Sequence, residues 1–227
     1  MAQQKELELE KLKEQVLKMG AFVESAIQKS IKALVERDRE LSLSVIEGDT
    51  IVNTYDVEIE EECIRFLALW QPTGSNLRFI TTAIKIITDL ERMGDLAVDI
   101  CERTIELLDE PQLKPYIDIP RMAEAAQTML KDSHDAFVEK DPDLAMKVCE
   151  ADDFVDNLNQ QIFNELLVYM LQDPKNIARA VRLTYVAKYL ERIGDHATNI
   201  AEMVVYMVKG KVIRHMACEM RSKEPGT

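Results

Sequence analysis

The chain has 227 residues, of which 47% are apolar and 30% charged, with only seven glycines and seven prolines. This composition is that of a folded domain and excludes a disordered chain. The formal net charge of −13 argues against nucleic acid or a bare anionic membrane as the main partner, because both are negatively charged. Cations or a basic protein surface are better matched.

Nothing in the sequence points to export or to a membrane. The segment 5–14 is densely charged and has no apolar signal core. No uncharged apolar run approaches the roughly 20 residues that span a bilayer. The four cysteines form no Cys-x-x-Cys pair, which predicts reduced thiols; they are Cys63, Cys101, Cys149 and Cys218. We therefore expect a soluble, cytoplasmic protein.

Prolines divide the chain into long segments in which apolar residues recur every three or four positions. This period predicts α-helices, and no sustained period-two alternation indicates a strand. The fold class is all-α. The predicted helices span residues 4–37, 39–70, 75–109, 120–140, 142–171 and 175–209.

The sequence repeats itself after about 100 residues. Residues 33–41 return as residues 136–144, and residues 90–100 return as residues 190–200. A repeat of this length is one structural unit present twice. The predicted organisation is two tandem three-helix bundles at 1–110 and 120–210, with a Pro-rich linker at 111–119 and a C-terminal tail at 211–227.

The third helix of each unit carries an acidic stripe, in which acids or amides are spaced four, four and three residues apart. At about 100° per residue they fall within one arc of roughly 80°. The stripes are Glu91, Asp95, Asp99 and Glu102, and Glu191, Asp195, Asn199 and Glu202. The second helices add Asp49 with Asn53, and Asp152 with Asp156.

These two sets can meet, because both helices of an antiparallel pair advance ~1.5 Å per residue. Asp49 lies about as far before the turn near residue 73 as Asp95 lies after it, and Asp152 and Asp195 are placed alike around residue 173. Each unit can therefore bring four or five oxygen-bearing side chains to one level.

A solvated face is the alternative interpretation of such acids. Against it, like charges four residues apart destabilise a helix. Gly94 and Gly194 also lie inside the third helices, where each costs ~1 kcal/mol relative to alanine. A destabilising feature that occurs twice indicates a ligand or a partner.

Carboxylate and amide oxygens without sulfur or imidazole suit a hard cation: Mg²⁺, Ca²⁺, Mn²⁺ or an iron ion. The histidines do not recur between units: His196 is interpreted as a local variation, and His134 and His215 as surface residues. The candidate metal ligands are Asp49, Asn53, Glu91, Asp95, Asp99, Asp152, Asp156, Glu191, Asp195 and Asn199.

Residues 190–202, together with their sister segment 90–102, resemble the PhoU family of phosphate-uptake regulators, and the likeness extends over nearly the whole chain. The resemblance implies an accessory regulator of the phosphate ABC transporter, acting on its cytoplasmic ATPase side, and of the sensor histidine kinase that controls phosphate-starvation genes. It also implies metal binding and homodimers or higher oligomers.

The family's metal motif corresponds to Glu91 and Asp95, and to Glu191 and Asp195. Its second-helix motif corresponds to the pairs Asp49 with Asn53 and Asp152 with Asp156. Asn53 stands where an acid is common, so we expect the first site to be the weaker one.

Two functional classes fit this pattern: an adapter without catalysis and a carboxylate-metal hydrolase. A hydrolase needs a nucleophile or a general base beside the metal. No Ser, Cys or His recurs with the motif, and no glycine-rich phosphate loop is present. The sequence therefore favours the adapter.

Overall fold

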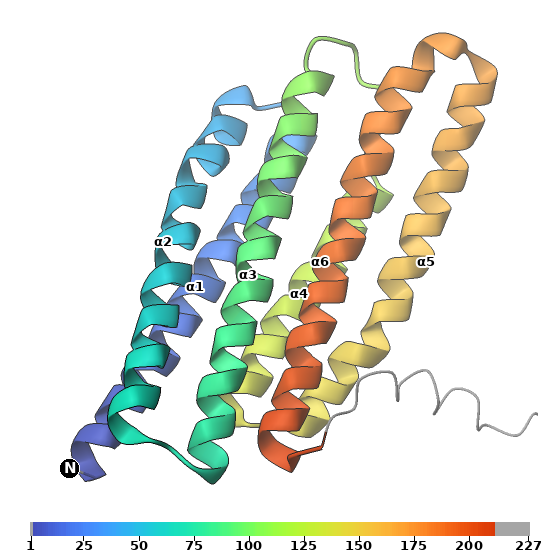
Figure 1. Cartoon of the computed structure of the whole chain (residues 1–227). Helices are drawn as coiled ribbons and strands as arrows, with labels where there is room; N and C mark the ends of the chain where they lie inside the picture. The colour runs from blue at the N-terminus through green and yellow to red at the C-terminus, as the bar shows by residue number, and fades with distance from the viewer. Residues whose placement is uncertain (1, 212–227) are drawn as a thin grey trace, which may run out of the picture.

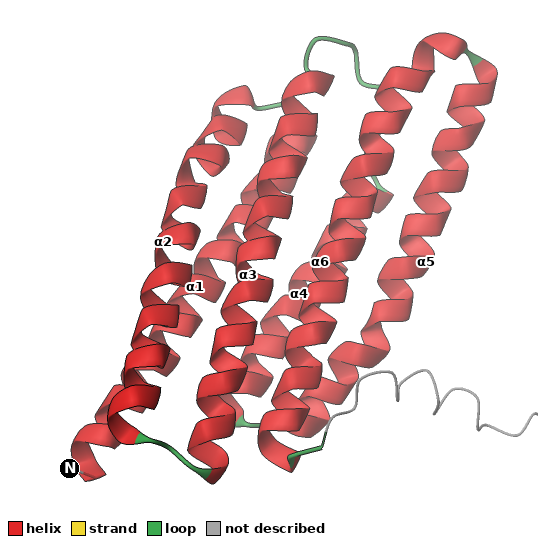
Figure 2. Ribbon diagram, in the orientation of Figure 1, coloured by secondary structure: helices red, strands yellow, loops and turns green. Residues whose placement is uncertain are grey.

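The computed structural model describes residues 2–211, which form six helices and no strand (Figures 1 and 2). The all-α prediction is confirmed, and each predicted helix end lies within about two residues of the observed one. The helices are α1 (Ala2–Glu36), α2 (Arg39–Trp70), α3 (Gly74–Leu107), α4 (Asp118–Glu139), α5 (Pro142–Gln172) and α6 (Ile177–Lys209), with a 3₁₀ turn, η1 (Pro174–Asn176), before α6.

The repeat is visible in how corresponding helices end and begin. Arg37 and Lys140 both take the left-handed conformation, with φ of 57° and 56°, and end α1 and α4. The aspartate that follows each one, Asp38 or Asp141, is the N-cap of the next helix and accepts a hydrogen bond from a backbone N–H three residues on. The same local chemistry therefore turns the chain twice.

Helices α1–α3 form the first bundle and α4–α6 the second, and the two lie side by side (Figure 1). Helix α3 packs against α6 and α1 against α4. Buried apolar side chains form a single cluster through both bundles, with Ile27, Ile86 and Leu190 fully buried. The two repeats thus share one hydrophobic core, which fixes their relative position.

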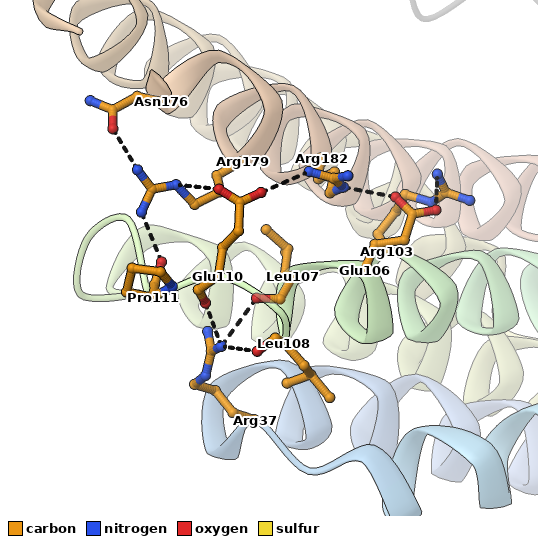
Figure 3. Close-up of polar contacts among 10 residues, drawn as sticks. All are labelled: Arg37, Arg103, Glu106, Leu107, Leu108, Glu110, Pro111, Asn176, Arg179 and Arg182. Atoms are coloured by element: carbon orange, nitrogen blue, oxygen red, sulfur yellow. Dashed lines mark hydrogen bonds and ion pairs between the residues drawn. The ribbon is translucent and has the colours of Figure 1, made fainter. Parts of the chain in front are cut away.

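At one end, an ion-pair network joins the end of α3 to the start of α6 (Figure 3). Arg182 Nε lies 2.8 Å from Glu106 Oε2, and its Nη1 lies 3.5 Å from Glu110 Oε1. Arg179 Nε lies 3.4 Å from Glu110 Oε2, and Arg103 Nη1 lies 2.7 Å from Glu106 Oε1. Each glutamate is shared between two arginines, so the contacts form a network rather than isolated pairs.

Arg37, the residue after α1, closes the C-terminus of α3 at the same junction (Figure 3). Its Nη2 donates to the carbonyl oxygens of Leu107, Leu108 and Glu110 at 3.1, 3.0 and 2.7 Å. Carbonyls at a helix end have no partner within the helix, so this guanidinium satisfies them.

The segment between α3 and α4 is packed against the second bundle. Lys114 is buried and its ammonium pairs with Glu165 of α5. Leu113 and Tyr116 pack against the core. This connection therefore adds to the contacts between the bundles.

Three of the four cysteines, Cys63, Cys101 and Cys149, are buried free thiols, as predicted, and burial raises the pKa of each to about 12. Cys218, His215 and nearly all of the predicted tail lie outside the described residues. Within residues 2–211, none of the helices combines the length and the apolar character needed to cross a lipid bilayer.

The prediction that His134 lies on the surface is wrong. Its side chain is only 7% exposed, and its ring lies against Gly20 of α1, where a Cβ atom would meet the imidazole at 2.0 Å. The helical pattern Leu130, His134, Phe137 places it on the buried face of α4. Glycine is required at position 20 because the ring occupies the space that a side chain would fill.

Burial lowers the pKa of His134 to about 4, although the nearby Asp135 opposes this shift. The folded state therefore favours the neutral ring, while the unfolded chain takes up a proton near pH 6.5. This contribution to stability is complete above pH 6.5 and falls by about 3 kcal/mol as the pH drops toward 4.

We expect His134→Leu to remove this pH-dependent contribution to stability, so that urea unfolding of the variant depends less on pH between about 6.5 and 4. An unchanged pH dependence would contradict the buried, neutral histidine.

Candidate metal centres

The structure brings the predicted acids of the first bundle together where α2 crosses α3. Asp49 of α2 lies near Asp95 of α3: burial raises the pKa of Asp49, and the Asp95 carboxylate adds to the rise. Asn53, one turn further along α2, donates from Nδ2 to Asp49 Oδ2 at 2.8 Å, and this hydrogen bond opposes the rise in the pKa of Asp49. Asp49 and Asp95 therefore lie at one level, as their similar distances from the turn predict.

Glu91 is the residue on which the repulsion converges. Burial raises its pKa, and the carboxylates of Asp95, Asp56 and Asp49 raise it further, against the opposing charge of Arg92. We call Asp49, Asp56, Glu91 and Asp95 the first acidic cluster.

Asp56 was not among the residues predicted from the sequence. It lies seven residues after Asp49, a spacing that returns to the same helix face. Its counterpart in the second repeat is Asn159, which carries no charge. The seven-residue spacing from Asp49 is the sequence signal for Asp56. The repeat does not point to it, because the corresponding residue is not an acid.

Asp152 is the centre of the corresponding site in the second bundle. Burial raises its pKa to about 6, with further contributions from Asp156, Asp195, Asp153 and Glu191. Its Oδ1 is buried and has no hydrogen-bond partner, which is unusual for a carboxylate oxygen. We call Asp152, Asp156, Glu191 and Asp195 the second acidic cluster.

A basic side chain is paired with each cluster. Arg92 Nε lies 3.3 Å from Glu91 Oε2, and Arg92 Nη1 lies 3.3 Å from Asp95 Oδ2. In the second cluster the Lys188 ammonium pairs with Glu191 Oε2. These cations offset part of the repulsion between the carboxylates.

Two other stripe residues, Asn199 and Asp99, turn toward the seam between α3 and α6. Asn199 donates from Nδ2 to Asp89 Oδ1 of the first bundle at 3.3 Å, and His196 Nδ1 lies 2.7 Å from the same oxygen. Burial raises the pKa of Asp99, and Arg192 of α6 is among the charges that oppose the rise. The stripe thus divides between the acidic clusters and the contact between bundles.

Packing accounts for one of the two glycines that occupy the same position in the third helix of each repeat. A Cβ on Gly94 would lie 3.2 Å from Asp49 Oδ1 and 3.3 Å from Val52 Cγ1, closer than side chains normally pack. At Gly194 the corresponding distances to Asp152 Oδ1 and Val155 Cγ1 are both 3.5 Å, an ordinary contact. Packing therefore accounts for Gly94 without a ligand but does not require glycine at position 194.

The donor set fits a hard cation. Both clusters offer carboxylate oxygens without sulfur, and the unpartnered Asp152 Oδ1 lacks the positive or hydrogen-bonding group that a buried carboxylate requires. In the part of the chain that the structure describes, no three His, Cys, Asp or Glu side chains are arranged around a common metal position. Binding would therefore require side chains such as Lys188 and Glu191 to rearrange.

Fold and clusters together define an all-helical, tandem-repeat protein with one acidic cluster in each repeat. The sequence profile of the PhoU domain matches this chain twice, over residues 16–104 and 119–204. The chain belongs to the PhoU family, which confirms the resemblance.

Relatives and solved structures agree with this assignment. The "phosphate-specific transport system accessory protein PhoU homolog" of Aquifex aeolicus is 48% identical over 92% of this chain and 94% of its own length. The PhoU protein of Escherichia coli K12 is 36% identical over 92% of this chain and 87% of its own. The crystal structure of PhoU from Pseudomonas aeruginosa superposes with a TM-score of 0.88 at 38% identity, covering 91% of this chain and 99% of that one. The PhoU structure from Streptococcus pneumoniae gives 0.86 at 30% identity, covering 92% and 98%.

We expect Asp152→Asn to stabilise the metal-free protein, because it removes a charge that the folded state disfavours. The raised pKa means that the penalty is complete above about pH 6 and disappears below the ordinary aspartate range. For a half-exposed group, screening by solvent reduces the gain to about 1–2 kcal/mol. Urea unfolding in the presence of a chelator at about pH 7.5 should show it, and the gain should shrink near pH 4. Destabilisation at both pH values would contradict the repulsion.

Proposed function

We propose that this protein is an adapter in phosphate homeostasis. It couples the phosphate ABC transporter to the sensor histidine kinase and represses phosphate-starvation genes when phosphate is plentiful. The observation that supports this most strongly is membership of the PhoU family over both repeats. The Aquifex and Escherichia coli relatives are named as accessory proteins of the phosphate-specific transport system.

The acidic surface suits docking in the cytoplasm. A net charge of −13 steers basic partner surfaces and disfavours nucleic acid and anionic lipid. In this proposal the protein acts as a homodimer and reaches the membrane only through its partners, chiefly the cytoplasmic ATPase side of the transporter.

Metal binding forms the second part of the proposal. Glu91 and Asp95 with Asp49 would hold a cation in the first bundle, and Glu191 and Asp195 with Asp152 and Asp156 in the second. The metal is iron, Mg²⁺, Mn²⁺ or Ca²⁺, since these prefer oxygen ligands. A bound cation would supply positive charge to carboxylates that now repel one another, as the raised pKa values of Asp49 and Asp152 indicate.

A carboxylate-metal hydrolase is the alternative function. The three described cysteines do not support it, because burial raises the pKa of each to about 12 and leaves no thiolate nucleophile. His196 Nδ1 is paired with Asp89 Oδ1 at the seam. The side chains of the clusters offer ligands and no activated nucleophile, which favours docking over catalysis.

Metal content tests the binding part. We expect each protein molecule, purified without chelator or affinity tag, to carry cations at both clusters. Glu191→Gln combined with Asp195→Asn should remove binding in the second bundle and leave the first bundle loaded. Because a ligand that binds only the folded state stabilises it, chelation should also lower the melting temperature. If elemental analysis shows the same metal content in the variant and the parent, the clusters are solvated surface and do not bind metal.

Gene regulation tests the docking part. Deleting the gene should leave phosphate-starvation genes expressed when phosphate is abundant, because the link between transporter and kinase is lost. A strain carrying folded protein with both clusters substituted, at Glu91 and Asp95 and at Glu191 and Asp195, separates docking from metal binding.

The outcomes of this experiment differ in meaning. Normal repression in the deletion strain rules out the regulatory function. Lost repression in the deletion strain with normal repression in the substituted strain retains docking and removes the metal from it. Robust phosphoester hydrolysis by the purified protein, abolished by the same substitutions, would favour the hydrolase.

A further inference from the structure

We propose that Lys188 is a built-in counter-ion of the second acidic cluster: its ammonium competes with the metal for Glu191 and lowers the metal affinity of the second bundle. The inference rests on the proposed function, because it concerns how the proposed metal site is regulated. It reverses the ranking expected from the sequence, in which Asn53 makes the first site the weaker one.

The contact itself places Lys188 on a ligand oxygen. Its ammonium pairs with Glu191 Oε2, and that oxygen is inaccessible to solvent. The Glu191 side chain is only 15% exposed, whereas the Lys188 side chain is 52% exposed. The lysine therefore reaches inward from the surface to cover the carboxylate, and a metal can use this oxygen only after the ammonium leaves.

The charge of Lys188 extends to a second ligand. Burial and the carboxylates of Glu191 and Asp156 raise the pKa of Asp195, and Lys188 opposes that rise. One ammonium thus acts on both acids of the Glu-x-x-x-Asp motif, which are the residues that would bind the metal.

The first repeat serves as an internal comparison. The position of Lys188 is occupied there by Thr88, whose hydroxyl donates to the carbonyl oxygen of Ile84 at 3.1 Å. Its acids are paired instead with Arg92, which is 57% exposed and makes contacts of 3.3 Å. The counterpart of Arg92 is Arg192, which acts on Asp99 across the seam. Lys188 thus lies over the buried Glu191 Oε2, whereas Arg92 meets Asp95 on a side chain that is 46% exposed.

An ordinary surface pair is the simpler interpretation, since residues three apart on a helix often form one and such pairs contribute little. That interpretation predicts no effect on metal binding. A competing counter-ion predicts a reciprocal coupling. Removing the ammonium should increase the affinity for the metal by the same factor by which bound metal weakens the contact between Lys188 and Glu191.

The experiment uses two forms of the full-length protein, each with one cluster intact. Glu91→Gln with Asp95→Asn leaves the second cluster, and Glu191→Gln with Asp195→Asn leaves the first. Free Mn²⁺ is measured by electron paramagnetic resonance during titration. In the form with the second cluster, Lys188→Gln should increase the affinity for Mn²⁺ about tenfold. Lys188→Arg keeps the charge and should leave this affinity low.

The reverse change provides the matched test. Thr88→Lys places a lysine three residues before Glu91, as Lys188 lies three residues before Glu191. It should lower the affinity for Mn²⁺ about tenfold in the form with the first cluster. Circular dichroism confirms that each variant keeps its helix content.

Unchanged affinity in both Lys188→Gln and Thr88→Lys, with Mn²⁺ still bound, overturns this inference and leaves the proposed metal site intact. Absence of Mn²⁺ binding in both single-cluster forms and in the unmodified protein overturns the metal site and the counter-ion together.

Discussion

The carboxylates of each bundle are held together by helix packing, against their mutual repulsion. Asp49 is fixed by the approach of α2 to Gly94 of α3, and Asp152 lies in the same way against Gly194 of α6. Burial and neighbouring acids raise the pKa of both. The hydrophobic core therefore supplies the free energy that keeps like charges adjacent. The like charges are therefore adjacent in the folded chain, and a cation would reduce their repulsion once Lys188 and Glu191 had rearranged.

The two repeats have diverged at the charges while keeping the packing. The first cluster has Asp56 and an exposed arginine, and the second has Asp156 and a lysine that covers Glu191. The left-handed residues that end α1 and α4, the N-caps Asp38 and Asp141, and most buried positions of α2 and α5 correspond between the repeats. Divergence of this kind gives two clusters of one architecture with different electrostatics, one paired with an exposed arginine and the other with a lysine.

The shared core and the junction at the end of α3 make the two clusters parts of one body. Arg37, Arg179 and Arg182 join three segments that are far apart in the chain, and Lys114 anchors the connection between the bundles. The acidic stripe takes part in the seam as well, since Asn199 contacts Asp89 there beside His196. A change in one cluster therefore acts on a helix that also contributes to the contact between bundles.

The sequence by itself determined the helices, the repeat and the level at which the acids of α2 and α3 meet. These features depend on helical period, capping residues and the equal rise of two paired helices, all of which are local. Tertiary structure alone decided that His134 is buried against Gly20, that Asn199 leaves the acidic stripe for Asp89, and that Lys188 covers Glu191. The first two depend on how one bundle docks on the other, across more than 100 residues of chain. The third depends on which of several neighbouring acids a flexible lysine reaches. Periodicity gives the face on which a side chain lies, and the packed neighbours decide its partner.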